Sequence, residues 1–439
     1  MQQAPFPTIF PETAAVSEAG HLVIGGCDTL QLVAEFGTPL YVFDEVTLRG
    51  RCQEFLREFG DRYPEVRVIY ACKAFVNRAV LRLLAEEGLG LDVVSAGELA
   101  VARSVEAAMD RVYFHGNNKG EDELRPALDW GIGRVVVDNF SELALLERLC
   151  AERGTVQDIL LRLSPGVDPH THAYTTTGIT DSKFGFPLAT GQAVEAVHAA
   201  QAASHLRLVG LHMHLGSPIF EVEPYEEATR AGIRFAAQMR DASGLDLREF
   251  SPGGGFPIQY VRERPATPIA AYAEPITRIL LEECRAAGMA PPRLVLEPGR
   301  AIVGRAGVAL YTVGARKDIP GVRSYVAVDG GMADNIRPAL YEARYEAVVA
   351  NKALETPAER VTVAGKYCES GDILLRDAEL PRLTTGDVLA IPASGAYCLA
   401  MSSNYNQATK PAVVLVRDGQ ARLIRRRESL EELFQYDVL

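Results

Sequence analysis

The fold is decided by the stretch VRVIYACKAFVNRAVLRLLAEEGLGLDVVSAGEL, residues 66–99. It begins with a β-branched apolar run, has apolar residues at helical spacing over 77–87, and ends in a second apolar run at 91–94. A strand, a helix and a strand in this order predict a βαβ unit with parallel strands. Polar residues, Lys73 and Ser95, follow the two strands directly.

The same alternation continues to Glu297. The expected strands are 66–72, 91–94, 111–115, 134–138, 158–163, 206–215, 247–251 and 293–297, and amphipathic segments such as 141–153 and 223–240 lie between them. Eight strands alternating with helices over roughly 240 residues predict a (β/α)8 TIM barrel, although a doubly wound sheet would also alternate. Eight strands are enough to close a barrel, which favours the barrel.

Beyond Gly299 the pattern changes to apolar runs separated by turns. The runs lie at 301–313, 324–328, 360–365, 387–391 and 412–417, without helices between them, and they predict an antiparallel β-domain. Strand-like runs near the N-terminus can join this domain. We therefore expect an N-terminal segment (1–44) that joins the β-domain, a barrel (45–299) and a C-terminal β-domain (300–439).

Composition excludes several classes of protein. Lys and Arg number 45 against 57 Asp and Glu, a net charge of -12, so the basic excess of a nucleic-acid binder is missing. The seven cysteines have no CxxC spacing, which argues against a zinc site or a disulfide framework and for a reducing compartment. No signal peptide and no apolar run of about 18 residues is present. We expect a cytoplasmic protein without membrane or nucleic-acid partners.

In a (β/α)8 barrel the chemistry lies at the C-terminal ends of the strands. The polar residues and glycines found there are Lys73, Ser95, His115, Arg162, His212, His214, Gly253–Gly255, Glu297 and Arg300. One polar residue at a strand end carries little information. A set that follows nearly every strand predicts a functional site.

Each member also has an ordinary structural interpretation. Lys73 is either a solvated surface lysine or an amine that attacks an aldehyde, since burial makes a lysine lose its proton more readily. Gly253–Gly255 is either a tight turn or a phosphate cradle before a helix, and Ser217 either caps a helix or adds a hydroxyl to that cradle.

His212 and His214 face the same side of their strand and are either buried, satisfied histidines or ligand contacts. We expect no metal site, because no Asp or Cys stands near them in the sequence. Glu297 either pairs with Arg300 or keeps a pyridine nitrogen protonated, which deepens the electron sink for a carbanion. Together the lysine, cradle, histidine and carboxylate fit pyridoxal 5'-phosphate.

These residues stand in motifs that closely resemble the diaminopimelate decarboxylases, among the fold-type-III pyridoxal-phosphate enzymes that include ornithine decarboxylase and alanine racemase. The resemblance runs from about residue 20 to 430. The motifs are YACKAF (70–75), LDVVSAGEL (91–99), HGNNK (115–119), THAYTTTGITDSKFGF (171–186), GLHMHLGS (210–217), GGGFP (253–257), EPGR (297–300), IRPALY (336–341), CESGD (368–372), GAY (395–397) and SSNYN (402–406).

The resemblance implies a role for each matching residue. Lys73 corresponds to the lysine that binds the cofactor aldehyde, His214 to the histidine stacked on the ring, and Glu297 to the partner of the pyridine nitrogen. Other cofactor contacts are implied for Ser217, Gly254, Gly255, Gly299, Arg300 and Tyr397. Substrate contacts are implied for Arg300, Arg337, Tyr341, Glu369 and Tyr397, and Cys368 corresponds to the proton donor.

In this family the CESGD segment enters the active site of a partner subunit, which implies a homodimer with shared sites. The implied reaction is the decarboxylation of meso-2,6-diaminopimelate to L-lysine and CO2. Two arginines can hold a carboxylate bidentately, and Glu369 can meet an ammonium group. Both groups are present at the distal end of diaminopimelate.

Three alternatives remain at this point. A decarboxylase of ornithine, lysine, arginine or carboxynorspermidine would not need Arg337, a racemase would need a second base that CESGD does not provide, and a non-catalytic homologue would not need both Lys73 and Cys368. Two departures from the family pattern, Pro218 and the SPGGGFP approach to the glycines, are expected beside the cofactor phosphate.

Overall fold

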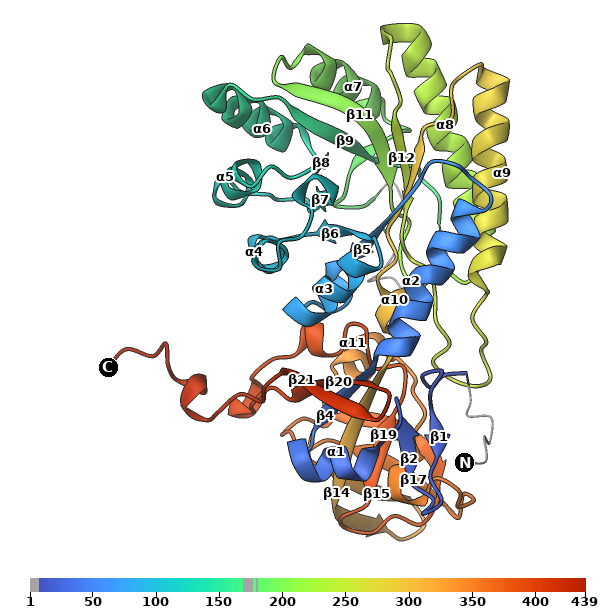
Figure 1. The fold of residues 1–439 in the computed structure, drawn as a ribbon, viewed down its shortest axis with the longest axis vertical. Coiled ribbons are helices and arrows are strands. Elements are labelled where there is room, and N and C mark those ends of the chain that lie inside the picture. Colours follow the sequence, from blue (N-terminus) through green and yellow to red (C-terminus); the bar gives the residue numbers. More distant parts are fainter. Residues whose placement is uncertain (1–7, 169–176, 179–180) are drawn as a thin grey trace. The chain divides into compact units, whose positions relative to one another are not determined.

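The computed structural model describes residues 8–168, 177–178 and 181–439. The chain divides into two compact units (Figure 1). Residues 52–257 and 267–299 form one, here called the barrel unit, and residues 1–51, 258–266 and 300–439 form the other, here called the β unit. The first boundary between the two units, between residues 51 and 52, lies inside helix α2 (Glu45–Gly60).

The barrel unit contains eight parallel strands in a closed ring. They are β5 (Val66–Ala71), β6 (Gly90–Val93), β7 (Val112–Phe114), β8 (Arg134–Val137), β9 (Gln157–Ser164), β11 (Leu206–Met213), β12 (Glu249–Gly253) and β13 (Arg293–Leu296). Pairing of β13 with β5 and of β8 with β9 closes the ring, and the short β10 (Phe186–Pro187) adds to β9. The predicted (β/α)8 barrel is confirmed.

Helices connect successive strands and lie outside them, as Figure 1 shows for those between β6 and β9. They are α3 (Arg78–Glu86), α4 (Ala96–Ser104), α5 (Glu121–Asp129), α6 (Phe140–Arg153), α7 (Gln192–Ala202), α8 (Glu223–Ser243) and α9 (Ile269–Ala287). The side chains of Asn77, Ser95 and Asn139 each accept a hydrogen bond from a first-turn N–H of the next helix. Ser95, one of the predicted polar groups at strand ends, is therefore a helix cap.

Apolar side chains fill the interior of the barrel. A buried cluster takes one residue from each of six strands, namely Ile69, Tyr113, Val136, Leu160, Val209 and Val295. At the first residue of β12, the buried carboxylate of Glu249 accepts a hydrogen bond from Tyr113 and pairs with Arg134 and Arg293. The middle and one end of the barrel are thus occupied by packing, which leaves the C-terminal ends of the strands for chemistry.

The β unit is built on a sheet in the order β18-β17-β15-β14-β4-β20-β21. Its strands are β4 (Leu40–Asp44), β14 (Gly307–Ile319), β15 (Arg323–Val328), β17 (Glu359–Ala364), β18 (Ile373–Leu380), β20 (Ala412–Arg417) and β21 (Gln420–Arg425). β19 (Val388–Ile391) also pairs with β14, and β16 (Val348–Val349) pairs with β19. Most pairs are antiparallel, as predicted, but β15–β17 and β4–β20 are parallel.

Smaller elements complete the β unit. The N-terminal part adds a three-stranded sheet of β1 (Ala15–Val16), β2 (Leu22–Ile24) and β3 (Cys27–Asp28), followed by α1 (Thr29–Phe36). The apolar run at 301–313 begins as a helical turn, α10 (Arg300–Val303), before β14 starts, and α11 (Arg337–Tyr341) forms where IRPALY stands. Among the described residues, none of the helices has the length and apolar character needed to span a bilayer.

Candidate active site

The mouth of the barrel places an amine beside a carboxylate. Lys73 lies in a short 3-10 turn (Cys72–Ala74) directly after β5, and its side chain is 41% exposed. The buried Asp92, the third residue of β6, brings Oδ2 to 3.5 Å from the Lys73 Nζ. The amine is therefore accessible to a small molecule while a buried negative charge holds it in place.

His115 lies between two carboxylates. It follows β7 and is buried, with Nε2 3.7 Å from Asp92 Oδ1 and 3.6 Å from Glu297 Oε1. Burial lowers the pKa of His115 well below its ordinary value, so its imidazole is neutral near pH 7. A continuous series of polar groups thus leads from Lys73 through Asp92 and His115 to Glu297.

Glu297 follows β13 and accepts two hydrogen bonds. The Nε2 of His212 lies 2.9 Å from one carboxylate oxygen, and the Ser251 hydroxyl donates to the other at 2.9 Å. Burial by itself would raise the pKa of Glu297, but His212 and His115 outweigh burial, and the pKa lies below its ordinary value. The carboxylate is therefore charged and suited to hold a protonated ring nitrogen.

The glycines after β12 allow a close approach of two strand ends. The Gly254 N–H donates to His214 Nδ1 at 3.3 Å. A side chain at Gly254 would lie 2.1 Å from the Glu297 carbonyl oxygen, and one at Gly255, where φ is +102°, would lie 2.4 Å from the Gly216 carbonyl oxygen. Only glycine fits both positions.

One expectation about this segment is corrected. The glycines were expected to precede a helix, but α9 begins only at Ile269, and a loop follows the glycines because residues 258–266 pack in the β unit. Within SPGGGFP, the Ser251 hydroxyl donates to Glu297. Ser217 follows β11. Gly299 packs against Ala71, and a side chain at position 299 would lie 3.0 Å from the Ala71 Cβ.

The polar groups at the barrel mouth fit pyridoxal phosphate. Both carboxylate oxygens of Asp92 and the Nε2 of His115 are buried and have no hydrogen-bond partner among the described residues. Buried polar groups of this kind call for a polar ligand.

His115, His212 and Glu297 also place potential metal-ligating atoms within 4.8 Å of one another, a spacing at which a metal ion can bind.

A second group of predicted residues lies in the β unit around Tyr260. The Arg337 guanidinium carbon is 4.7 Å from the centre of the Tyr260 ring, and the Arg300 carbon is 5.7 Å from it. Arg300 also donates to the Tyr260 hydroxyl and lies 4.8 Å from the centre of the Tyr397 ring. Two buried cations, Arg300 and Arg337, thus lie next to the same aromatic ring.

Arg337 is buried, and the partners of its guanidinium among the described residues are aromatic side chains. It donates to the Tyr345 hydroxyl, and no carboxylate of the described residues forms an ion pair with it. Burying a guanidinium without a carboxylate partner reduces the stability of the fold unless an anion binds it. Tyr341, the other residue of this motif with an implied substrate contact, ends α11 and is half-buried.

The CESGD segment presents Cys368 and Glu369 at the surface of the β unit, where both are exposed. The Cys368 N–H donates to Asn406 Oδ1 at 3.2 Å, and Glu369 accepts a hydrogen bond from the Tyr405 hydroxyl. SSNYN and CESGD, distant in sequence, are therefore joined in one surface feature.

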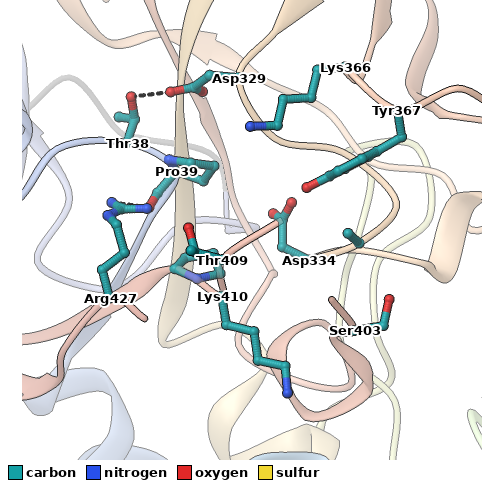
Figure 2. A pocket seen from close by; sticks show the side chains of 12 residues that line it. Thr38, Pro39, Asp329, Asp334, Lys366, Tyr367, Ser403, Thr409, Lys410 and Arg427 are labelled. Carbon is teal, nitrogen blue, oxygen red and sulfur yellow. Dashed lines mark hydrogen bonds between the residues drawn. The ribbon is translucent and has the colours of Figure 1, made fainter. Parts of the chain in front are cut away.

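The base of this segment is fixed by the buried Asp372. Its carboxylate accepts hydrogen bonds from the Met332 N–H at 2.7 Å and the Tyr367 N–H at 2.8 Å. Beside it lies a cavity of about 180 Å³ (Figure 2). Its lining includes Lys366, Tyr367 and Asp334, and Figure 2 shows the Tyr367 hydroxyl directed toward Asp334.

Several site residues were not predicted. Asp92, Ser251, Tyr260 and Tyr345 had no assigned role, although Asp92 stands within LDVVSAGEL and Tyr260 closely follows the glycines. His115 and His212 were expected at strand ends without a function. Much of THAYTTTGITDSKFGF (171–186) lies outside the described residues.

The barrel and the residues at its mouth define a pyridoxal-phosphate enzyme. Residues 47–304 match the family model of the pyridoxal-binding domain of pyridoxal-dependent decarboxylases. The diaminopimelate decarboxylase of Bacillus subtilis is 46% identical over 426 residues, 97% of each chain, and that of Mycobacterium tuberculosis is 42% identical over 98% of each chain. The crystal structure of the M. jannaschii diaminopimelate decarboxylase with L-lysine has a TM-score of 0.91 at 34% identity and covers 98% of each chain.

The chain belongs to the diaminopimelate decarboxylases. Its cofactor is therefore pyridoxal 5'-phosphate, for which Lys73 would offer the amine and Glu297 the partner of the ring nitrogen. The glycine segment beside His214 would hold the phosphate through backbone N–H groups. When bound, the cofactor supplies an electron sink for the electrons left by departing CO2.

Proposed function

We propose that the chain decarboxylates meso-2,6-diaminopimelate to L-lysine and CO2. The observation that carries the proposal is Arg337, a buried guanidinium with no carboxylate partner among the described residues. The substrate ends in a second amino-acid group, whose carboxylate a planar guanidinium binds with two parallel hydrogen bonds. Ornithine, lysine and arginine have no such carboxylate.

Different residues of the chain act at the two ends of the substrate. At the reacting end, Lys73 binds the cofactor, and Asp92 lies between the Lys73 amine and His115. At the distal end, the carboxylate is bound by Arg337, Arg300 and Tyr341, and the ammonium group is bound by Glu369. Cys368 delivers the proton to the carbon that has lost CO2.

A substrate panel tests this function. The purified chain with pyridoxal phosphate is incubated with meso-diaminopimelate, ornithine, lysine and arginine, and CO2 and the amine or amino-acid product are measured. We expect L-lysine and one CO2 per meso-diaminopimelate consumed, with turnover of the other three at least about 100-fold slower. Faster turnover of ornithine or lysine would contradict the assignment.

We further propose a homodimer with shared active sites. Cys368 and Glu369 are exposed in the single chain and held on a well-fixed segment, which suits residues that complete the site of a partner. A two-fold dimer would place each segment at the partner's barrel. Neither residue would then act on substrate held by Lys73 of its own chain.

Mixing two inactive variants tests the shared site. Lys73→Ala and Cys368→Ala chains are allowed to exchange subunits, which gives heterodimers in about half of the dimers. Each heterodimer has one intact site, so activity near one quarter of the parent's is expected. Exchange confirmed by mass spectrometry without any gain in activity would contradict shared sites.

We also propose that the chain works in the cytoplasm. All seven cysteines lie within the described residues and are free thiols, which is the state that a reducing compartment maintains. Fractionation of cells that express the natural gene should recover the protein with cytoplasmic markers. Recovery with membranes or in the medium would contradict this proposal.

A further inference from the structure

The carboxylate of Glu297 is held by residues on two neighbouring strands. In the parallel pair β11–β12, His212 is the register partner of Ser251, so their side chains emerge at the same level. His212 reaches one carboxylate oxygen and Ser251 the other, both at 2.9 Å. His212 and Ser251 are 1% and 0% exposed, so water does not compete for these bonds.

The contacts of His212 assign its proton. Its Nε2 faces the carboxylate, which only accepts hydrogen bonds, so Nε2 carries hydrogen. Its Nδ1 is buried and has no partner among the described residues. The hydrogen bond to Glu297 therefore orients the buried imidazole of His212.

We propose that His212 and Ser251 are positioning residues, which hold Glu297 ionised and aimed at the ring nitrogen of pyridoxal phosphate and so set the affinity for this cofactor. A carboxylate without these donors would be a buried charge with unmet hydrogen bonds and would take up a proton instead. A protonated Glu297 cannot stabilise a protonated ring nitrogen. The inference rests on cofactor use by the barrel site and does not depend on which amino acid is decarboxylated.

The barrel contains a matched control for the loss of a buried hydrogen bond. Tyr113 donates to the buried Glu249 at 2.8 Å. Glu249 is the first residue of β12, whereas Ser251 lies two residues nearer the end that carries the glycines. Tyr113→Phe therefore breaks a bond of the same kind away from the strand ends that carry Lys73 and Glu297.

The experiment measures the dissociation constant of pyridoxal phosphate for the full-length chain by titrating the apoprotein. His212→Leu should weaken binding about three- to tenfold, the size expected for a lost hydrogen bond to a charged group, and Ser251→Ala about threefold. His212→Gln, which keeps an N–H near the Nε2 position, should stay within about twofold of the parent. Tyr113→Phe should leave the dissociation constant unchanged.

A double-mutant cycle then decides how His212 acts. Glu297→Gln alone should weaken cofactor binding about tenfold, and adding His212→Leu to it should have no further effect, because the positioned carboxylate is already gone. Independent multiplication of the two effects, or equal weakening by Tyr113→Phe, would overturn the proposal. If His212→Leu does not fold, the same cycle with Ser251→Ala gives the same decision.

Discussion

Two buried carboxylates, Glu297 in the barrel unit and Asp334 in the β unit, both accept hydrogen bonds, but their pKa values are shifted in opposite directions. Glu297 accepts hydrogen bonds from His212 and Ser251. Asp334 accepts them from the Tyr311 and Tyr41 hydroxyls and from the Gly331 N–H. Yet the pKa of Glu297 is lowered, whereas burial raises the pKa of Asp334 to about 6.

The difference shows that the kind of neighbour, and not the number of hydrogen bonds, sets the charge of a buried carboxylate. Tyrosine hydroxyls are neutral and cannot repay the cost of burying a charge, and the nearby Asp372 adds repulsion. Two histidines face Glu297, and the Nε2 of His212 lies 2.9 Å from its carboxylate, which together lower its pKa in spite of burial. The barrel carboxylate is thus suited to hold a cation, and Asp334 serves as a structural acceptor beside the cavity of Figure 2.

The largest effect is expected at the barrel mouth from Lys73→Ala. The variant lacks the amine that binds the cofactor aldehyde, so activity on meso-diaminopimelate should fall at least about 1,000-fold. Lys317→Ala, at an exposed position of β14, should leave activity unchanged. Borohydride reduction followed by peptide mapping should label Lys73, and label on a different lysine would refute its role.

Replacing each carboxylate by a neutral amide of nearly the same shape tests whether their roles differ. Glu297→Gln should lower kcat by about 100-fold, or about 2.7 kcal/mol, because the ring nitrogen loses its anionic partner. Asp334→Asn should change kcat by less than about twofold. Steady-state rates at saturating cofactor measure both, and a similar loss in the two variants would remove the distinction.

Arg337→Lys should cause a smaller loss within the β unit. Lysine keeps the charge but not the planar pair of donors, so kcat/KM for meso-diaminopimelate should fall about tenfold or more. Arg344→Lys, at an exposed arginine that pairs with Glu263, is the control and should behave as the parent. Unchanged kcat/KM for Arg337→Lys would mean that this side chain does not read the distal carboxylate.

The smallest effect concerns stability against pH. Asp334 has a folded pKa of about 6 and an ordinary value of 3.8, so between these values the folded chain holds a proton that the unfolded chain has lost. Stability should therefore fall as pH rises from about 4 to 6, by at most about 1.4 kcal/mol per pH unit. Urea unfolding of Asp334→Asn should show a weaker decline than the parent, and an equal decline would contradict the raised pKa.

The fold and the polar residues at the mouth of the barrel could be predicted because they have local signals. Strand and helix periodicity places the barrel, and Lys73, His214 and Glu297 stand at strand ends where a barrel puts its chemistry. Ser251 and Tyr260 could not be assigned in this way. The role of Ser251 depends on the register of β11 with β12, and that of Tyr260 on two arginines that are distant in sequence.

The β unit was predicted less completely for the same reason. One of its two parallel pairs arises because β4, from the N-terminal part of the chain, lies between β14 and β20. A linear pattern of apolar runs does not contain this order. The pKa of Asp334 likewise depends on the folded sheet, because burial there raises it and the hydroxyls of Tyr311 (β14) and Tyr41 (β4) lower it only in part.

The charge of the two carboxylates is tested most directly by infrared difference spectroscopy of the full-length chain at pH 5. At this pH Asp334 should be largely protonated and Glu297 ionised. Asp334→Asn should therefore remove a protonated-carboxyl band from the parent spectrum, whereas Glu297→Gln should remove only carboxylate bands. Loss of a protonated-carboxyl band in Glu297→Gln would contradict the account, because a neutral Glu297 could not hold the protonated ring of the cofactor.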